Sequence, residues 1–209
     1  MTRIAAIVAA VIVVASLAAT YVWTQGGTAQ DSAFAQCSGG AVGGDLGGPF
    51  TLVNSAGETV TDQDVLTKPS LLYFGYTFCP DVCPFDMARN VQATSILAET
   101  GLDVTPVFIS IDPKRDTPEV VGDYTFYLGE NVVGLTGTPE QVKAASQAYR
   151  TYYRAHEATE GDEFYLVDHS TFTYLTLPGH GFVDFFRRDT TPEAMADRVA
   201  CFVEAAAAS

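Results

Sequence analysis

A continuous apolar run at Ser70–Tyr76 (SLLYFGY) constrains the fold of this chain more than any other feature. The run has the length of a strand and lacks the alternation of polar and apolar residues that marks a strand with one solvent face. A strand that is apolar on both faces must be covered on both, as at the centre of an α/β sheet. Thr105–Ile111 (TPVFISI) shows the same pattern and predicts a second buried strand.

Helix signals alternate with these strands. Thr-Pro-Glu occurs at 117–119, 138–140 and 191–193, and a threonine N-cap followed by proline at the first helical position is a strong start signal. These starts predict helices to about Leu128, Tyr149 and Glu204. A further helix is expected over Phe85–Glu99, with Gly101 as its stop. The remaining expected elements are hairpins over 50–60 and 172–186 and a short strand over 132–135.

The order of these elements limits the architecture. An N-terminal hairpin is followed by strands and helices in alternation, and then by a second hairpin and a terminal helix. This alternation predicts an α/β domain in which a mixed sheet carries helices on both faces. A thioredoxin-like fold has this order, and so do other α/β domains, so the pattern alone leaves the choice between them open.

An uncharged segment, Ile4–Trp23, precedes the domain. A helix of about 20 residues is about 30 Å long and spans one hydrocarbon core. Arg3 lies before the segment, so the positive-inside rule leaves the N-terminus in the cytoplasm. A cleaved signal peptide is the alternative, although its apolar part is usually only about 7–15 residues long. We therefore expect residues 1–25 to be a single transmembrane anchor, 26–48 a flexible tether, and 49–209 one domain on the periplasmic side of the inner membrane.

The chain is acidic, with a formal net charge of −14. Binding to nucleic acid or to anionic lipid depends on Lys and Arg, so this balance argues against both classes of partner. It is compatible with an ordinary soluble surface and with electrostatic steering of a basic partner.

Cys79 and Cys83 follow the first buried strand and open the helix after it. A helix N-terminus lowers the pKa of a thiol, and a thiolate is both a nucleophile and a ligand for soft metals. The spacing of the two cysteines places both sulfurs on one side of a helical turn. A structural disulfide, a redox dithiol and a metal site all fit. Redox dithiols usually have two intervening residues rather than three, which favours a site for Cu(I) or Zn(II).

Two thiolates need a further ligand, and the chain has three histidines. His169 enters a predicted strand that a thioredoxin-like sheet would place beside the cysteine loop, so it is the candidate third ligand. His156, in an acidic loop, and His180, in a Pro-Gly-His-Gly turn, are expected at the surface. Met87 lies one turn after Cys83 and is expected in the core.

Three segments of the chain carry a resemblance to a known family: residues 73–84, 110–118 and 167–170. They are similar to the Sco/SenC copper-binding proteins of cytochrome oxidase assembly, and the similarity extends from about Gly48 to the last helix. The resemblance implies a membrane-anchored thioredoxin fold that binds Cu(I) or Cu(II) through Cys79, Cys83 and His169. It also implies delivery of copper to the binuclear copper site of a terminal oxidase, with other periplasmic copper carriers as partners.

Two functions stay open on this basis. One is a copper metallochaperone, and the other is a thiol–disulfide oxidoreductase that keeps the cysteines of the oxidase copper site reduced; a thiol peroxidase is a weaker third. His169 separates them, because a copper site needs it and a dithiol reductase does not. We therefore expect a metal carrier rather than an enzyme.

Charged residues near the candidate ligands have expected roles of their own. Asp168 either orients His169 or is a surface carboxylate, and Asp81 is expected to form the turn between the cysteines. A charged docking loop is expected at Asp112, Lys114, Arg115 and Asp116, with Asp116 or Thr117 also capping the next helix.

Cys37 and Cys201 remain, and they are not part of the family pattern. Disulfides persist in an exported domain, and the two ends of a compact domain often lie close together. We expect the two cysteines to pair, with Cα atoms about 4.4–6.8 Å apart. The alternative is a buried Cys201 and a free Cys37. Lipidation of Cys37 is disfavoured because Gln36 is too large for the preceding position.

Overall fold

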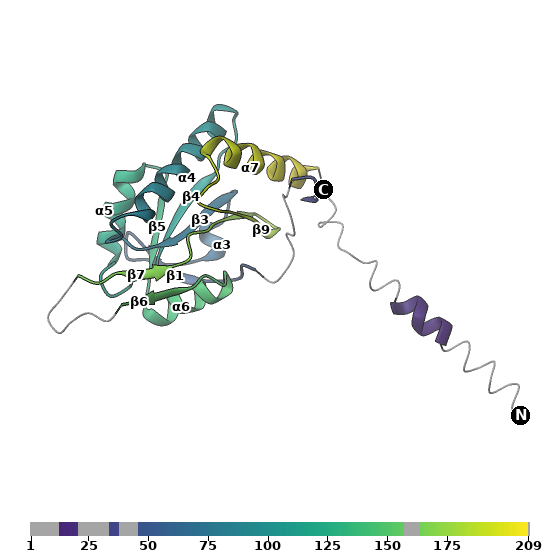
Figure 1. Cartoon of the computed structure of the whole chain (residues 1–209), viewed down its shortest axis with the longest axis horizontal. Coiled ribbons are helices and arrows are strands. Elements are labelled where there is room, and N and C mark those ends of the chain that lie inside the picture. The colour runs from purple at the N-terminus through teal and green to yellow at the C-terminus, as the bar shows by residue number, and fades with distance from the viewer. Residues whose placement is uncertain (1–12, 21–33, 38–45, 157–163, 209) are drawn as a thin grey trace, which may run out of the picture.

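The computed structural model describes residues 13–20, 34–37, 46–156 and 164–208. Its centre is a seven-stranded mixed sheet with the order β2-β1-β5-β4-β3-β8-β9, and β6 and β7 form a separate two-stranded ribbon. Figure 1 shows α4 and α7 on one side of the sheet and α6 on the other. The elements are β1 (Thr51–Asn54), β2 (Thr59–Thr61), α3 (Asp62–Val65), β3 (Ser70–Gly75), α4 (Val82–Glu99), β4 (Thr105–Ser110), α5 (Pro118–Leu128), β5 (Val133–Thr136), α6 (Pro139–Ala148), β6 (Tyr153–Ala155), β7 (Val167–His169), β8 (Thr173–Leu177), β9 (Gly181–Phe186) and α7 (Pro192–Ala207).

The two apolar runs form the middle of the sheet, as predicted. β3 and β4 pair in parallel, and β3 pairs with β8 in the antiparallel sense on its other edge. Every residue of β3 is buried. Both predicted hairpins are present as β1–β2 and β8–β9. The expected α/β class is therefore confirmed.

Helices α5, α6 and α7 begin at the Thr-Pro-Glu triplets. The side chains of Thr117, Thr138 and Thr191 accept hydrogen bonds from the backbone N–H three residues later, at 3.3, 3.3 and 3.2 Å. Helix α4 begins at Val82, earlier than the predicted start at Phe85. Proline is tolerated in the first turn of a helix, where its missing N–H has no intrahelical partner. The early start places Cys83 in the first turn of α4.

The short helix α3 and the ribbon β6–β7 were not expected from the sequence. The prediction that His169 enters a strand is wrong in detail, because His169 is the last residue of β7. A strand of three residues with mixed polarity is too short to show a periodicity. The ribbon is not part of the seven-stranded sheet, so other contacts must set the position of His169.

The N-terminal predictions fall partly outside the described residues. Of the predicted anchor, Ile4–Trp23, only residues 13–20 are described, and they are helical. Among the residues that the structure describes, no helix is long and apolar enough to cross a membrane. Of the predicted tether, Phe34 and Cys37 are described and are buried. Cys37 forms the expected disulfide with Cys201, with a Cα–Cα distance of 5.6 Å.

Candidate metal centre

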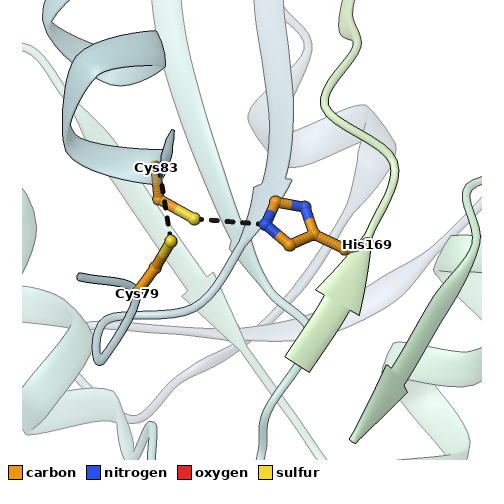
Figure 2. A group of neighbouring side chains, drawn as sticks. All are labelled: Cys79, Cys83 and His169. Atoms are coloured by element: carbon orange, nitrogen blue, oxygen red, sulfur yellow. Dashed lines mark hydrogen bonds between the residues drawn. The ribbon is translucent and has the colours of Figure 1, made fainter. Parts of the chain in front are cut away.

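Three side chains from two distant parts of the chain meet at the carboxyl end of β3. Cys79 lies in the loop after β3, Cys83 in the first turn of α4, and His169 at the end of β7. Their sulfur and nitrogen atoms all lie within 4.8 Å of one another. The sulfur of Cys83 is 3.4 Å from Nε2 of His169, and Figure 2 shows all three side chains pointing to one place. The structure thus brings together the three candidate ligands named from the sequence.

The two cysteines differ in their protonation. The backbone N–H of Cys83 points at the sulfur of Cys79, 3.4 Å away. A hydrogen bond from the Cys83 thiol lowers the pKa of Cys79 to about 3, against the opposing effect of burial. The same hydrogen bond, together with burial, raises the pKa of Cys83. At neutral pH the pair therefore holds one thiolate and one thiol, and a metal that binds both sulfurs displaces the proton of Cys83.

The imidazole of His169 is held with its Nε2 toward the sulfurs. Nδ1 lies 2.9 Å from the carbonyl oxygen of Ser170, which can only accept a hydrogen bond, so Nδ1 donates to it and Nε2 is the nitrogen that faces the sulfurs. The rings of Tyr73 and Tyr76 meet the imidazole edge-on, with centroid distances of 6.1 and 5.9 Å. The hydrogen bond from Nδ1 to the Ser170 carbonyl is the kind of contact by which proteins usually orient a histidine ligand.

Gly75 makes room for the site. A Cβ at this position would lie 3.0 Å from the sulfur of Cys83 and 2.8 Å from Cε1 of Tyr73. The sulfur therefore approaches the end of β3 more closely than any larger residue would allow.

Tyr73 and Asp86 belong to the site although neither was singled out in the sequence. The hydroxyl of Tyr73 donates to Asp86 at 3.0 Å, and Asp86 forms ion pairs with Arg89 and Arg188 at 3.5 and 3.3 Å. Asp86 is only 3% exposed. The sequence offered one signal for Asp86: it is a carboxylate three residues after Cys83, on the apolar side of the predicted helix. Met87 is fully buried, as expected.

The prediction of a charged docking loop is wrong for its two carboxylates, because docking requires exposed side chains and these are buried. Asp112 and Asp116 are 5% and 0% exposed. Asp116 accepts hydrogen bonds from the backbone N–H and the hydroxyl of Thr77, at 3.0 and 2.6 Å, and from Ser110 at 2.6 Å. Burial raises its pKa, and these hydrogen bonds oppose the shift. Thr117, not Asp116, caps α5.

Asp168 takes the second of its two expected roles: it is an exposed carboxylate, 2.9 Å from Nε2 of His156, and Nδ1 of His169 contacts the carbonyl of Ser170 instead. His156 is exposed, as expected. His180 is half-buried and packs edge-on against Phe34, with ring centroids 5.3 Å apart. Asp81 is the exposed N-cap residue of α4, where its side chain makes no capping hydrogen bond. Neither His156 nor His180 lies in the group formed by the two cysteines and His169.

The donor set fits a soft metal ion. Metal–sulfur bonds are about 2.3 Å long and metal–nitrogen bonds about 2.0 Å. Their sum exceeds the 3.4 Å between Cys83 Sγ and His169 Nε2, so one ion can bind both atoms without rearrangement of the backbone. Two sulfurs and one imidazole suit copper and zinc rather than magnesium or calcium.

Comparison with known proteins agrees with this geometry. Protein SenC of Rhodobacter capsulatus is 56% identical over 174 residues, which are 82% of this chain and 78% of that protein. Copper-bound ScoI from Arabidopsis thaliana, solved as a crystal structure, has 39% sequence identity to this chain. The two structures superpose with a TM-score of 0.72 over 76% of this chain and 98% of the ScoI chain. BsSco, described as a member of the Sco family of cytochrome c oxidase assembly proteins, is 21% identical, with a TM-score of 0.59 over 78% of this chain and 94% of its own, and supports the fold alone.

These likenesses settle the choice among α/β folds left open by the order of elements. The fold is the thioredoxin-like fold of the Sco proteins. The SCO1/SenC family matches residues 39–204, a range that includes Cys79, Cys83 and His169. By this match and by its identity to SenC, the chain belongs to the SCO1/SenC family.

Proposed function

We propose that this protein is a copper metallochaperone that holds Cu(I) or Cu(II) on Cys79, Cys83 and His169 and delivers it to the binuclear copper site of a terminal oxidase. One observation carries the proposal: two sulfurs and an oriented imidazole nitrogen lie within 4.8 Å of one another. A copper-bound relative with the same fold supports copper as the cargo. The resemblance of residues 73–84, 110–118 and 167–170 to the Sco/SenC proteins of cytochrome oxidase assembly supports the destination.

Copper is the cargo, so the site must release it as well as bind it. Three protein ligands leave a low-coordinate ion with room for a ligand from another protein. Copper then passes by exchange of one ligand at a time and is never free in solution. Because both sulfurs must be reduced to bind copper, oxidation of the pair to a disulfide removes the site.

A second candidate is reduction of the disulfide in the oxidase copper site, because the low pKa of Cys79 keeps its sulfur as a thiolate, the form that attacks disulfides. In that reaction the Cys79 thiolate attacks one sulfur of the target disulfide and expels the other. Cys83 then loses its proton and attacks the sulfur of Cys79. The target leaves as a dithiol, and a Cys79–Cys83 disulfide remains. A thiolate of low pKa is a weak nucleophile, and this step does not use His169, so we rank it second.

A transfer assay separates the two functions. Copper-loaded protein is mixed with the copper-free, reduced copper-site domain of an oxidase, and copper is quantified on each partner after separation. We expect copper to move to the acceptor, and the His169→Ala variant to transfer none. A parallel reaction uses the oxidised acceptor and copper-free protein. The reductase would be favoured by two results together. Wild type and His169→Ala would generate acceptor thiols equally, and the first reaction would show no copper transfer.

We also propose the membrane topology inferred from the apolar N-terminal segment. Residues 1–25 anchor the chain in the inner membrane, residues 26–48 tether it, and residues 49–209 form the copper domain on the periplasmic side. The protein is then expected to stay in the membrane pellet after a carbonate wash, and a C-terminal reporter to be active outside the cytoplasm. Recovery of a shortened chain in the supernatant would point to a cleaved signal peptide.

A further inference from the structure

One guanidinium group touches both parts of the chain that carry the candidate ligands. Arg115 lies in the loop after β4, and its Cζ is 3.6 Å from the centroid of the Tyr165 ring and 4.9 Å from that of Phe78. Phe78 immediately precedes Cys79, and Tyr165 lies four residues before His169. A guanidinium stacked on aromatic faces gains cation–π energy and keeps its N–H groups free for hydrogen bonds in the ring plane.

Tyr165 is held at three points. Its ring lies under the guanidinium, and its backbone carbonyl accepts a hydrogen bond from Nη1 of Arg115 at 2.9 Å. Its hydroxyl donates to Asp112 at 2.7 Å. Asp112 also pairs with Nε of Arg115, and it is only 5% exposed. Asp112, Arg115 and Tyr165 thus form a closed triangle of contacts, which we call the clasp.

The same loop also holds the cysteine side of the site. Asp116 follows Arg115 directly and accepts the backbone N–H and the hydroxyl of Thr77, two residues before Cys79. Asp116 is completely buried. The loop from Asp112 to Asp116 therefore binds the cysteine loop through Asp116 and the histidine segment through the clasp.

The clasp matters because His169 lies outside the seven-stranded sheet. The sheet fixes the ends of β3 and β4 by continuous hydrogen bonding, whereas among the described strands β7 pairs only with β6. The ring of Tyr76 meets the imidazole of His169 edge-on and adds one contact between the ribbon and the cysteine loop. The clasp adds a cation–π contact and three polar contacts immediately before the ribbon strand that ends in His169.

We infer that Arg115, with Asp112 and Tyr165, is a positioning group that holds His169 against the two sulfurs and so completes the copper site. This inference rests on the proposed function. The contacts that carry the inference join Arg115 to residues beside the ligands, so it acts on copper through the placement of His169.

The test is a double-mutant cycle on the full chain in detergent, with copper affinity measured by competition against a chelator. The Arg115→Ala variant is expected to bind copper about 10–100-fold more weakly, the range seen when a group that orients a metal ligand is removed. Nitrogen hyperfine coupling in the EPR spectrum of the Cu(II) form should decrease, while the sulfur-to-copper charge-transfer absorption persists. In the His169→Ala background, Arg115→Ala should cause no further loss.

Two milder variants keep the inference testable if Arg115→Ala folds poorly. Arg115→Lys keeps the charge beside Asp112 but loses the planar stack and should still weaken copper binding. Tyr165→Phe keeps the stack but loses the hydroxyl contact and should have a smaller effect. Arg154→Ala is the matched control, because Arg154 is an exposed arginine on the neighbouring strand β6. It should bind copper as the wild type does.

The outcomes separate this inference from the proposed function. Wild-type copper affinity and unchanged nitrogen coupling in both Arg115→Ala and Arg115→Lys would overturn the clasp. An equal loss caused by Arg115→Ala with and without His169 would also overturn it, because the effect would then not pass through the histidine. If the wild type binds no copper, the proposed function itself fails.

Discussion

The Cys83→Ser variant is expected to lose copper affinity by a factor on the order of 10²–10³. Apparent binding energies of structural thiolate and imidazole sites are about 10–16 kcal/mol for four ligands, so one ligand contributes about 2.5–4 kcal/mol. Cys83 is completely buried and its sulfur is 3.4 Å from Nε2 of His169, so no water or neighbouring side chain can replace it without movement of α4. Cys79→Ser and His169→Ala are expected to cost a similar amount.

Competition with a chelator and quantification of copper per chain measure this effect. Wild-type protein should bind about one copper ion on its three ligands, with thiolate-to-Cu(II) absorption that the serine variants reduce. His156→Ala and His180→Ala are the matched controls, because both histidines lie outside the ligand group. Tight, unchanged copper binding by His169→Ala would remove the three-ligand assignment.

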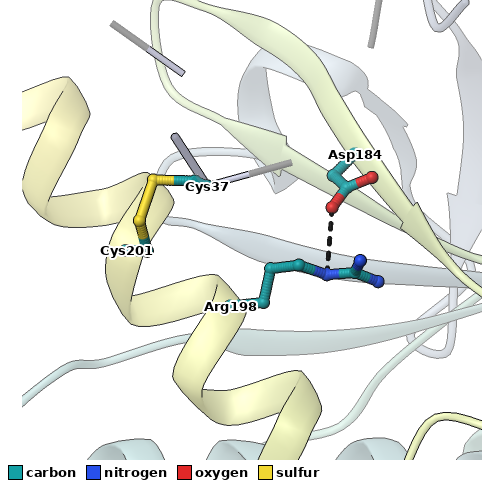
Figure 3. The surroundings of a disulfide bond; sticks show 4 residues. All are labelled: Cys37, Asp184, Arg198 and Cys201. Carbon is teal, nitrogen blue, oxygen red and sulfur yellow. Dashed lines mark ion pairs between the residues drawn. A yellow bond between two sulfur atoms is a disulfide. The ribbon is translucent and has the colours of Figure 1, made fainter. Parts of the chain in front are cut away.

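The second large effect concerns the disulfide between Cys37 and Cys201. The double variant Cys37→Ser/Cys201→Ser is expected to lose about 2–5 kcal/mol of unfolding free energy. The bond spans 164 residues of sequence, and the chain-entropy model assigns about 5 kcal/mol to the closure of a loop of this length. Figure 3 shows the bond joining the N-terminal segment to α7, next to the ion pair of Arg198 with Asp184.

Denaturant unfolding of the copper-free protein measures the loss. Reduction of the wild type with dithiothreitol should lower its stability to that of the double variant and leave the double variant unchanged. The copper content of the double variant should stay at about one per chain, because the disulfide is separate from the candidate ligands. Equal stability of the variant and the oxidised wild type would show that the bond does not constrain the unfolded chain.

Much of the molecule could be predicted from local patterns. The apolar runs at Ser70–Tyr76 and Thr105–Ile111 are buried strands, because a strand without a polar face can only lie inside a sheet. The threonine caps begin three helices where expected, because capping depends on residues within one turn. The cysteine pair, close in sequence as well as in space, identified two of the three candidate ligands, and the choice of His169 among the three histidines supplied the third.

Tertiary structure alone decided how these residues are held. His169 reaches the sulfurs from a three-residue strand outside the main sheet, and such a strand has no periodicity to read. Asp112 and Asp116 are charged and lie in a loop, which predicts exposure, yet they are buried because Tyr165 and Thr77 supply hydrogen bonds from 53 and 39 residues away. The cost of burying a charge is set by partners that the sequence does not place nearby. Local composition therefore determined which residues could bind the metal, and long-range polar contacts decided how those residues are held.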